Sequence, residues 1–321
     1  MTDGSRKAII AAFFANLGIA ISKFIGFAIT GSASLLAEAV HSLADTGNQG
    51  LLFYGGAASK KAESPSHPFG YGRERYFWAF AVALVLFSMG GAFALYEGIK
   101  KVQDPHAIEN LTVAVVILVL AILLESYSLR TAIKESRLVK DPSTSWWGFI
   151  RTSKQPELPV VLLEDIGAEI GLFIALGGIL LAEATGNPRW DAVGSIAIGV
   201  LLIVIAIVLM IEMKSLLIGE AAGKQSRADI VAALEGGPHV RRLIHVRTQH
   251  IGPDEILVGA KIEFDPALTA EQLVVAVNAT EDAVRAAEPR VTVMYVEPDL
   301  HTVDHPDLLA DSAPGEDDHD S

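Results

Sequence analysis

The stretch Glu38–Asp45, EAVHSLAD, places one histidine and two carboxylates inside an apolar run from residue 33 to residue 57. A helix needs about 20 apolar residues to cross a bilayer, so this run is long enough to do so. An Asp at the centre of such a helix costs roughly 2.5 to 3.5 kcal/mol, and buried ionisable groups usually mark an ion or proton path. His41 and Asp45 are four residues apart and share one helix face, so one metal ion can bridge them.

The composition predicts a membrane domain joined to an acidic soluble part. The 321 residues are 51% hydrophobic, with a mean hydropathy of +0.39, yet the net charge is −13, so apolar and charged residues must be segregated along the chain. Apolar runs of spanning length cover residues 8–29, 33–57, 76–98, 111–132, 157–182 and 190–217. We therefore predict an α-helical membrane protein with six transmembrane helices in residues 1–217. The first run has no small-residue cleavage site, so we expect it to be retained.

Basic residues are concentrated in two of the connections between these runs. They are Lys60, Lys61, Arg73 and Arg75 in the second connection, and Lys134, Arg137, Lys140, Arg151 and Lys154 in the fourth. The positive-inside rule then puts both termini in the cytoplasm. We expect a multi-pass protein of the bacterial inner membrane. The chain has no cysteine, so a metal site must use nitrogen and oxygen donors.

The pattern changes after residue 217 and becomes typical of a small soluble domain. Helical and strand patterns follow one another at residues 227–235, 240–250, 256–264, 269–287 and 290–296, with a Gly-Pro-Asp turn signal at 252–254. This order predicts an α+β domain over residues 218–300, with helices on one face of a three-stranded sheet. From residue 302 the chain holds seven acidic residues with Pro and Gly, so we predict a disordered acidic tail over 301–321.

The fifth apolar run supplies the second half of a possible metal site. It carries Glu164, Asp165 and Glu169 in an otherwise apolar sequence. Asp165 and Glu169 share one helix face, whereas Glu164 lies about 100° around the helix from Asp165. Together with His41 and Asp45, the Asp165–Glu169 pair gives four ligands. One imidazole and three carboxylates suit zinc, manganese, iron(II) and cobalt.

The chain resembles the cation diffusion facilitators, which include the zinc transporters, from about Ala11 to Pro298. The resemblance is carried by residues 12–49, by HPFGYGRERYFW at 67–78, by the soluble-domain stretch 244–264 and by YVEP at 295–298. It implies six spans, a cytoplasmic ferredoxin-like domain and a homodimer in membrane lipid, with no nucleic-acid partner. It also implies a secondary active transporter, not an enzyme, that exports divalent cations in exchange for protons by alternating access. Zinc is the expected substrate, with iron, manganese or cobalt as alternatives.

The family's metal-site pattern matches His41, Asp45 and Asp165 residue by residue. The position four before Asp165, where many members have His or Asp, is Val161 here, and this departure leaves the fourth ligand open. We expect Glu169 to be the fourth ligand because it shares a face with Asp165, with Glu164 as the alternative.

Other family positions predict weaker or indirect roles. His67 in the second connection and His245 and Glu297 in the soluble domain would form only weak auxiliary sites. Lys261 and Tyr295 stand where relatives can have histidines, so we expect no binuclear site in that domain. The resemblance also suggests an interlock between Arg73 and Glu220.

Three further polar residues lie within the first, second and fourth runs. Glu38, one turn from His41, is expected to contact protons or metal on the exit side. Lys23 and Glu125 are expected to be packing or snorkelling groups.

A different class of function also fits the sequence. The chain could be a membrane-embedded metal sensor or scaffold without net transport, although the weak auxiliary sites do not favour it. A passive channel would give flux that is insensitive to a pH gradient. An intramembrane hydrolase is disfavoured because no HExxH or nucleophile motif accompanies the buried acids.

Overall fold

The computed structural model describes residues 3–105 and 107–301, with side chains described from Asn16 onward. The chain forms two compact units. The first contains residues up to 60 together with 74–215, and the second contains residues 61–73 together with the chain from 216 onward. The predicted tail lies, from residue 302, outside the described residues.

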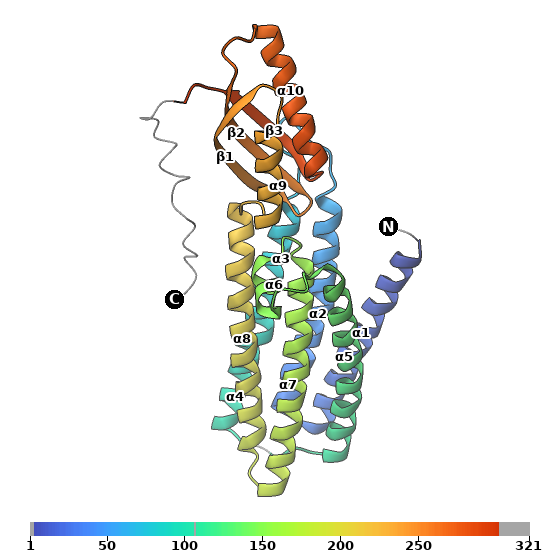
Figure 1. Cartoon of the computed structure of the whole chain (residues 1–321). Helices are drawn as coiled ribbons and strands as arrows, with labels where there is room; N and C mark the ends of the chain where they lie inside the picture. Colours follow the sequence, from blue (N-terminus) through green and yellow to red (C-terminus); the bar gives the residue numbers. More distant parts are fainter. Residues whose placement is uncertain (1–2, 106, 302–321) are drawn as a thin grey trace. The chain divides into compact units, whose positions relative to one another are not determined.

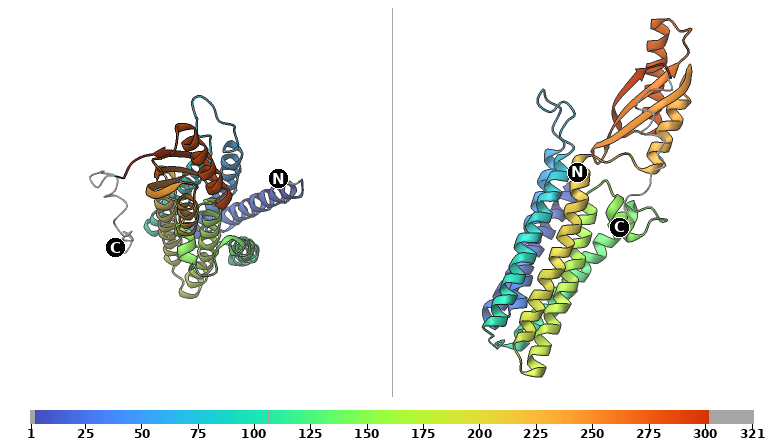
Figure 2. Two further views of the ribbon diagram at one scale, coloured as in Figure 1. Left: turned by 45° about the horizontal axis from the view of Figure 1, so that its top comes forward. Right: turned by 90° about the vertical axis from the view of Figure 1, so that its left-hand side faces the viewer.

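The first unit is helical, and its long helices run side by side along one axis (Figures 1 and 2). Its elements are α1 (Asp3–Thr30), α2 (Ala33–Ala58), α3 (Glu74–Val85), a π-helix η1 (Leu86–Ala92), α4 (Phe93–Gln103), α5 (Leu111–Val139), α6 (Trp146–Thr152), α7 (Glu157–Thr185) and α8 (Arg189–Ile218). Each of the six predicted apolar runs is therefore helical. The run 76–98 extends over α3, η1 and part of α4, because η1 continues the helix between them.

Four helical segments of the described chain are long and apolar enough to cross a membrane. They are Glu74–Gln103, Leu111–Val139, Glu157–Thr185 and Arg189–Ile218. Within α1 the apolar helix described is the shorter Asn16–Thr30, and α2 is interrupted by Glu38, His41 and Asp45. The same polar residues that predict a functional site thus lower the apolar character of α2.

Helix α2 is the central element for the site, since it packs against α1, α3, η1, α4 and α7, while α5 packs against α1 and α7. Glycines allow the closest helix approaches in this unit. A Cβ atom added to Gly199 of α8 would lie 2.7 Å from the Leu95 nitrogen of α4. A Cβ atom added to Gly90 of η1 would lie 3.7 Å from Nδ1 of His41, so the π-helix passes directly beside this histidine.

The second unit contains the predicted α+β domain, and the predicted order of helix, strand, strand, helix and strand is confirmed. Its elements are α9 (Lys224–Glu235), β1 (Val240–Gly252), β2 (Glu255–Phe264), α10 (Ala270–Ala287) and β3 (Val291–Pro298). The sheet order is β1-β2-β3, with β1 antiparallel and β3 parallel to β2. Helices α9 and α10 contact each other and cover one face of the sheet (Figures 1 and 2).

Alternation along β2 explains this packing. Every second residue is buried, and the buried set is Ile256, Val258, Ala260, Ile262 and Phe264. These side chains form one core with apolar residues of both helices, including Ile230 and Val284. Helix α10 begins with a complete capping box between Thr269 and Gln272, as its sequence predicts.

Candidate metal-transport site

Helix α2 places His41 and Asp45 on one face, one turn apart. Nδ1 of His41 lies 3.5 Å from Oδ1 of Asp45, and the His41 side chain is completely buried. The Asp45 side chain keeps 17% of its surface exposed. The pair therefore presents an inner imidazole and an outer carboxylate along the same helix face.

The three candidate acidic residues in the middle of α7 form hydrogen bonds to two different helices. The Glu164 carboxylate is buried and accepts a hydrogen bond of 2.6 Å from the Asn48 side chain of α2. Asp165 accepts one of 3.0 Å from the Ser128 hydroxyl, and Glu169 accepts one of 2.8 Å from the Ser126 hydroxyl, both on α5. Glu164 thus bonds to α2, whereas Asp165 and Glu169 bond to α5.

A small polar cavity lies where these helices meet. The cavity is large enough to hold a water molecule or a bare metal ion. The lining residues come from α1, α2, α5 and α7: Asn16, Ser42, Asp45, Gln49, Glu125, Val161, Glu164 and Asp165. Of the five predicted ligand candidates, Asp45, Glu164 and Asp165 line the cavity, while His41 and Glu169 lie outside its lining.

The cavity collects like charges. Asp45 lies within electrostatic range of Glu164, Glu125 and Asp165, each of which repels its ionised form. Within the described chain, however, no three His, Asp or Glu side chains converge closely enough to hold a metal ion. The carboxylates of Asp45, Glu125, Glu164 and Asp165 line the cavity without converging on one point.

Several buried polar atoms near the cavity have no hydrogen-bond partner among the described residues. Among the described residues, those near the cavity without a hydrogen-bond partner are Glu38 Oε1, both ring nitrogens of His41, Asp45 Oδ1, Asn48 Oδ1 and Glu169 Oε2. An unsatisfied buried polar group costs about 1–3 kcal/mol, and such groups in a native protein call for an explanation such as ion binding or proton transfer. All of these atoms belong to α2 and α7.

Comparison with known proteins identifies the family. The family model described as the cation efflux transmembrane domain matches residues 9–218. The chain belongs to the cation efflux family. This confirms the resemblance inferred from the sequence, and together with its apolar helices it makes the chain a multi-pass membrane protein.

Curated relatives of this cation efflux protein include transporters and magnetosome proteins. The mouse mitochondrial proton-coupled zinc antiporter SLC30A9 is 33% identical over 263 residues, which are 82% of this chain and 46% of the relative. Metal tolerance protein C4 of Arabidopsis thaliana is 30% identical over 275 residues, covering 83% of this chain and 59% of the relative. The chain therefore spans about half the length of these two relatives.

A bacterial relative and a solved structure extend the comparison. The magnetosome protein MamM of Magnetospirillum gryphiswaldense is 28% identical over 280 residues, which are 85% of this chain and 81% of MamM. The nickel form of a MamM C-terminal domain variant is 29% identical, with a TM-score of 0.24, and covers 25% of this chain and all of that chain.

Two residues of the cation efflux domain that were expected to be packing or snorkelling groups lie at or next to the cavity. Glu125 of α5 lines the cavity. Lys23 of α1 has no exposed surface, so of its two expected roles snorkelling is excluded. Instead, its Nζ lies 3.2 Å from Oε2 of Glu38, the residue expected on the exit side. A lone lysine in an apolar run was the available signal, but only the packing of helices reveals its partners.

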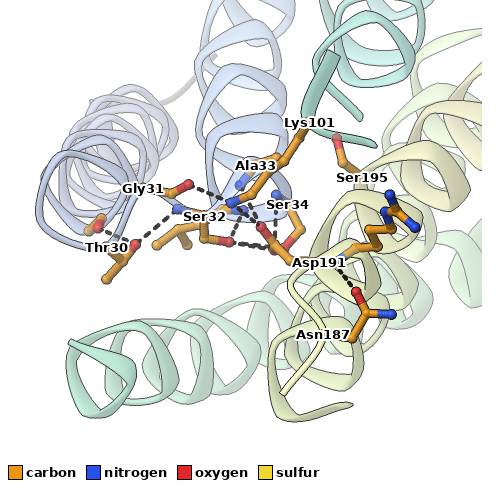
Figure 3. Close-up of polar contacts among 12 residues, drawn as sticks. Thr30, Gly31, Ser32, Ala33, Ser34, Lys101, Asn187, Asp191 and Ser195 are labelled. Atoms are coloured by element: carbon orange, nitrogen blue, oxygen red, sulfur yellow. Dashed lines mark hydrogen bonds and ion pairs between the residues drawn. The ribbon is translucent and has the colours of Figure 1, made fainter. Parts of the chain in front are cut away.

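A second buried polar cluster joins the N-terminus of α2 to α4 and α8 (Figure 3). Asp191 of α8 accepts hydrogen bonds from the Ala33 nitrogen (2.8 Å), the Ser32 hydroxyl (2.7 Å) and both the nitrogen and hydroxyl of Ser34. Lys101 Nζ lies 2.8 Å from Asp191 and also donates to the Gly31 carbonyl (2.7 Å). Asp191 therefore accepts hydrogen bonds from main-chain N–H groups at the N-terminus of α2 and also pairs with the buried ammonium group of Lys101.

Lys261 lies close to both predicted auxiliary positions of the soluble domain, His245 and Glu297. Lys261 on β2 lies opposite His245 on β1 in the sheet. Its Nζ lies 3.6 Å from Glu297 and 3.4 Å from Asp299. A lysine between these donors opposes a cation. His67 is exposed and contacts the Tyr71 ring at 4.4 Å between centroids.

The interlock predicted between Arg73 and Glu220 stays a prediction. Arg73 is exposed, while the Glu220 carbonyl accepts a hydrogen bond of 2.8 Å from the His250 nitrogen. A well-formed ion pair lies two residues further on, where Arg75 contacts Glu157 through two hydrogen bonds of 2.5 and 2.8 Å.

Proposed function

We propose that this chain exports divalent transition-metal cations from the cytoplasm in exchange for protons, by alternating access. The observation that carries the proposal is the cavity, in which Asp45, Glu164 and Asp165 surround a space large enough for one ion within the helices of a cation efflux domain. Zinc is the first candidate because relatives at 30–33% identity include proton-coupled zinc antiporters. Iron, manganese and cobalt suit the same donors.

We assign His41, Asp45, Asp165 and Glu164 as the transport ligands. The cavity supports Glu164 over Glu169 for the fourth position, because Glu164 lines it and Glu169 does not. His41 lies outside the cavity lining but only 3.5 Å from Asp45, so a change of its rotamer would be needed for it to bind the same ion.

Competition between protons and metal would couple the two fluxes. A metal ion requires ionised carboxylates and a neutral imidazole, so binding from one side releases protons, and protons arriving from the other side release the metal. Histidine changes charge near neutral pH, which makes His41 the natural pH-sensitive ligand. The π-helix η1 beside His41 is typical of functional segments and would give this part of the bundle room to move.

The architecture that we propose has six spans. Helix α2 has 26 residues and is about 39 Å long, which exceeds the roughly 30 Å of a bilayer core. Its polar residues Asp45 and Gln49 line the cavity, so they need not face lipid. With α1 it would complete the six-helix domain, with both termini in the cytoplasm of a bacterial cell. We further propose that the protein is a homodimer joined through its soluble domain.

The test is metal uptake into proteoliposomes with an imposed pH gradient, using zinc, manganese, iron(II) and cobalt. Uptake should follow the gradient in the wild type and fall by about 100-fold or more in Asp165→Asn and Glu164→Gln, since each removes a charged ligand. Glu183→Gln is the matched control, because Glu183 is an exposed carboxylate on the same helix.

The variants also separate the remaining alternatives. Loss of uptake in Glu169→Gln with retention in Glu164→Gln would assign the fourth position to Glu169. Metal binding without flux for every metal would overturn transport in favour of a sensor, and flux that is insensitive to the pH gradient would indicate a channel.

A further inference from the structure

Lys23 of α1 is a fully buried lysine beside the cavity. Its Nζ donates a 2.6 Å hydrogen bond to the Ser42 hydroxyl and lies 3.2 Å from Oε2 of Glu38, both on α2. Oε1 of Glu125 on α5 lies at 4.0 Å. One ammonium group therefore connects three helices of the transport domain.

The energetics of this arrangement call for a reason beyond packing. Desolvating a lysine and a carboxylate costs several kcal/mol for each ion, and well-packed apolar side chains of similar volume are often at least as stable as a buried ion pair. Lys23 and Glu38 both have no exposed surface. A protonated lysine offers no lone pair, so Lys23 is not itself a metal ligand.

The contacts of Lys23 lead directly to the cavity. Ser42 and Glu125 both line it, together with the proposed ligands. Glu38 points from Lys23 toward α7, where its Oε1 atom occupies the space that a side chain at Gly171 would need. That oxygen has no hydrogen-bond partner among the described residues. Glu38 is thus a buried carboxylate with an unused oxygen, held by the lysine.

Charge decides what this lysine does for a cation in the cavity. Five carboxylates lie in or next to the cavity: Glu38, Asp45, Glu125, Glu164 and Asp165. If all five were available, a divalent ion would bind very tightly and leave slowly. The single positive charge of the ammonium group offsets one negative charge, shared between Glu38 at 3.2 Å and Glu125 at 4.0 Å, and it also repels the incoming ion.

We propose that Lys23 is a built-in counter-cation that holds Glu38 and Glu125, so that a divalent transition-metal ion binds the proposed ligands without these two carboxylates and remains releasable. Lys23 is a positioning residue that acts through these two carboxylates. The inference deepens the proposed function and rests on it. In this proposal, Lys23 and the metal ion compete for the Glu38 carboxylate, so Glu38 is not simply a metal contact.

The experiment compares metal affinity and turnover in the purified full-length chain. Zinc and cobalt binding is measured by calorimetry at one pH for the wild type, Lys23→Met and Lys23→Arg, and uptake is measured in proteoliposomes. Lys23→Met should bind metal about tenfold tighter or more, because a nearby positive charge is lost. Its KM and kcat should fall together, while Lys23→Arg keeps the charge and stays near the wild type.

A purely structural lysine gives a different result. It would reduce the amount of folded protein without tightening metal binding in the folded fraction, and unchanged or weaker binding by folded Lys23→Met would overturn the proposal. If Lys23→Met does not fold, Glu38→Gln tests the same idea in the opposite direction. It frees the ammonium toward the cavity and should weaken metal binding several-fold, so unchanged or tighter binding would overturn the proposal.

The same data separate this inference from the proposed function. Suppose that the wild type shows no gradient-driven uptake, while Lys23→Met binds metal more tightly and Glu38→Gln more weakly than the wild type. This result would refute transport and retain the counter-cation role of Lys23. Normal uptake without that affinity order would refute the counter-cation and retain transport.

Discussion

Two buried polar clusters on helix α2 differ in how completely their hydrogen bonds are formed. At the helix N-terminus, Asp191 accepts bonds from two main-chain nitrogens, two hydroxyls and the ammonium of Lys101. Two turns further along, His41 and Asp45 keep ring nitrogens and a carboxylate oxygen without hydrogen-bond partners among the described residues. The first cluster is complete, and the second has capacity left for a cation or protons.

The difference shows what each cluster contributes. A complete network in a low-dielectric interior fixes the elements that it joins, here the ends of α2, α4 and α8. A cluster of mutually repelling carboxylates costs folding free energy and is compensated when a cation enters. Mutations in the two clusters should therefore have different effects. Those in the first should lower stability, whereas those in the second should abolish metal binding without lowering stability.

Breaking the complete cluster should give the largest effect on folding. Lys101→Met leaves the Asp191 carboxylate buried without its charged partner and should lower the free energy of unfolding by about 3–5 kcal/mol. The neighbouring Lys100→Met is the matched control, because Lys100 is 64% exposed and should change stability by no more than about 0.5 kcal/mol. Thermal unfolding in detergent measures both variants. Equal effects of the two substitutions would remove the distinction between the clusters.

Neutralising the incomplete cluster should have the opposite sign. Asp45→Asn keeps the side-chain shape but removes one of the charges that Glu164, Glu125 and Asp165 repel, so the unfolding free energy in chelator should be unchanged or raised by about 1 kcal/mol. Metal binding should be lost in the same variant. Asp191→Asn makes the identical chemical change in the complete cluster and should destabilise. A lower melting temperature for Asp45→Asn would show that its charge serves folding.

The sequence predicted the elements of both units well because local patterns determine them. Apolar runs located the helices, and alternation from Ile256 to Phe264 located β2 and its buried face. The pairing of β3 parallel to β2 was not predicted, because it depends on where α10 returns the chain. Six spans were predicted, and four helical segments of the described chain are long and apolar enough to cross a membrane. Helix α2 is not among them, because Glu38, His41 and Asp45 weaken its apolar character.

The candidate site was predicted in part, for a physical reason. His41 and Asp45 lie on one helix, so their spacing alone places them together. Contacts between helices, such as Lys23 with Glu38 or Asn48 with Glu164, depend on helix rotation and packing that a single sequence does not specify. The role of Asp191 was not predicted, because an acidic residue in the first turn of a helix is common. Its partners Lys101 and Ala33 lie 90 and 158 residues away in the sequence.

A third polar cluster lies in the soluble domain, and its mutation should have the smallest effect on stability. Glu288, at the C-terminal end of α10, accepts two hydrogen bonds of 2.9 and 2.7 Å from Arg290, which also donates to Ser226. The Arg290 guanidinium lowers the pKa of Glu288 from 4.5 to about 2. Because the folded-state pKa is depressed, the stabilisation is complete above about pH 4.5 and is lost as the pH falls toward 2.

Glu288→Gln should therefore destabilise the soluble domain by about 1 kcal/mol at pH 7, a modest value because Arg290 is 41% exposed and solvent screens the pair. The difference from the wild type should shrink below pH 4.5 and vanish near pH 2. Hydrogen exchange of β3 in the full-length protein, corrected for intrinsic rates, measures it at each pH, with the exposed Glu235→Gln as control. A difference that persists to pH 2 would mean that Glu288 stabilises the fold through packing and not through its charge. The contribution of charge to the complete Asp191 cluster would then also be smaller than we infer.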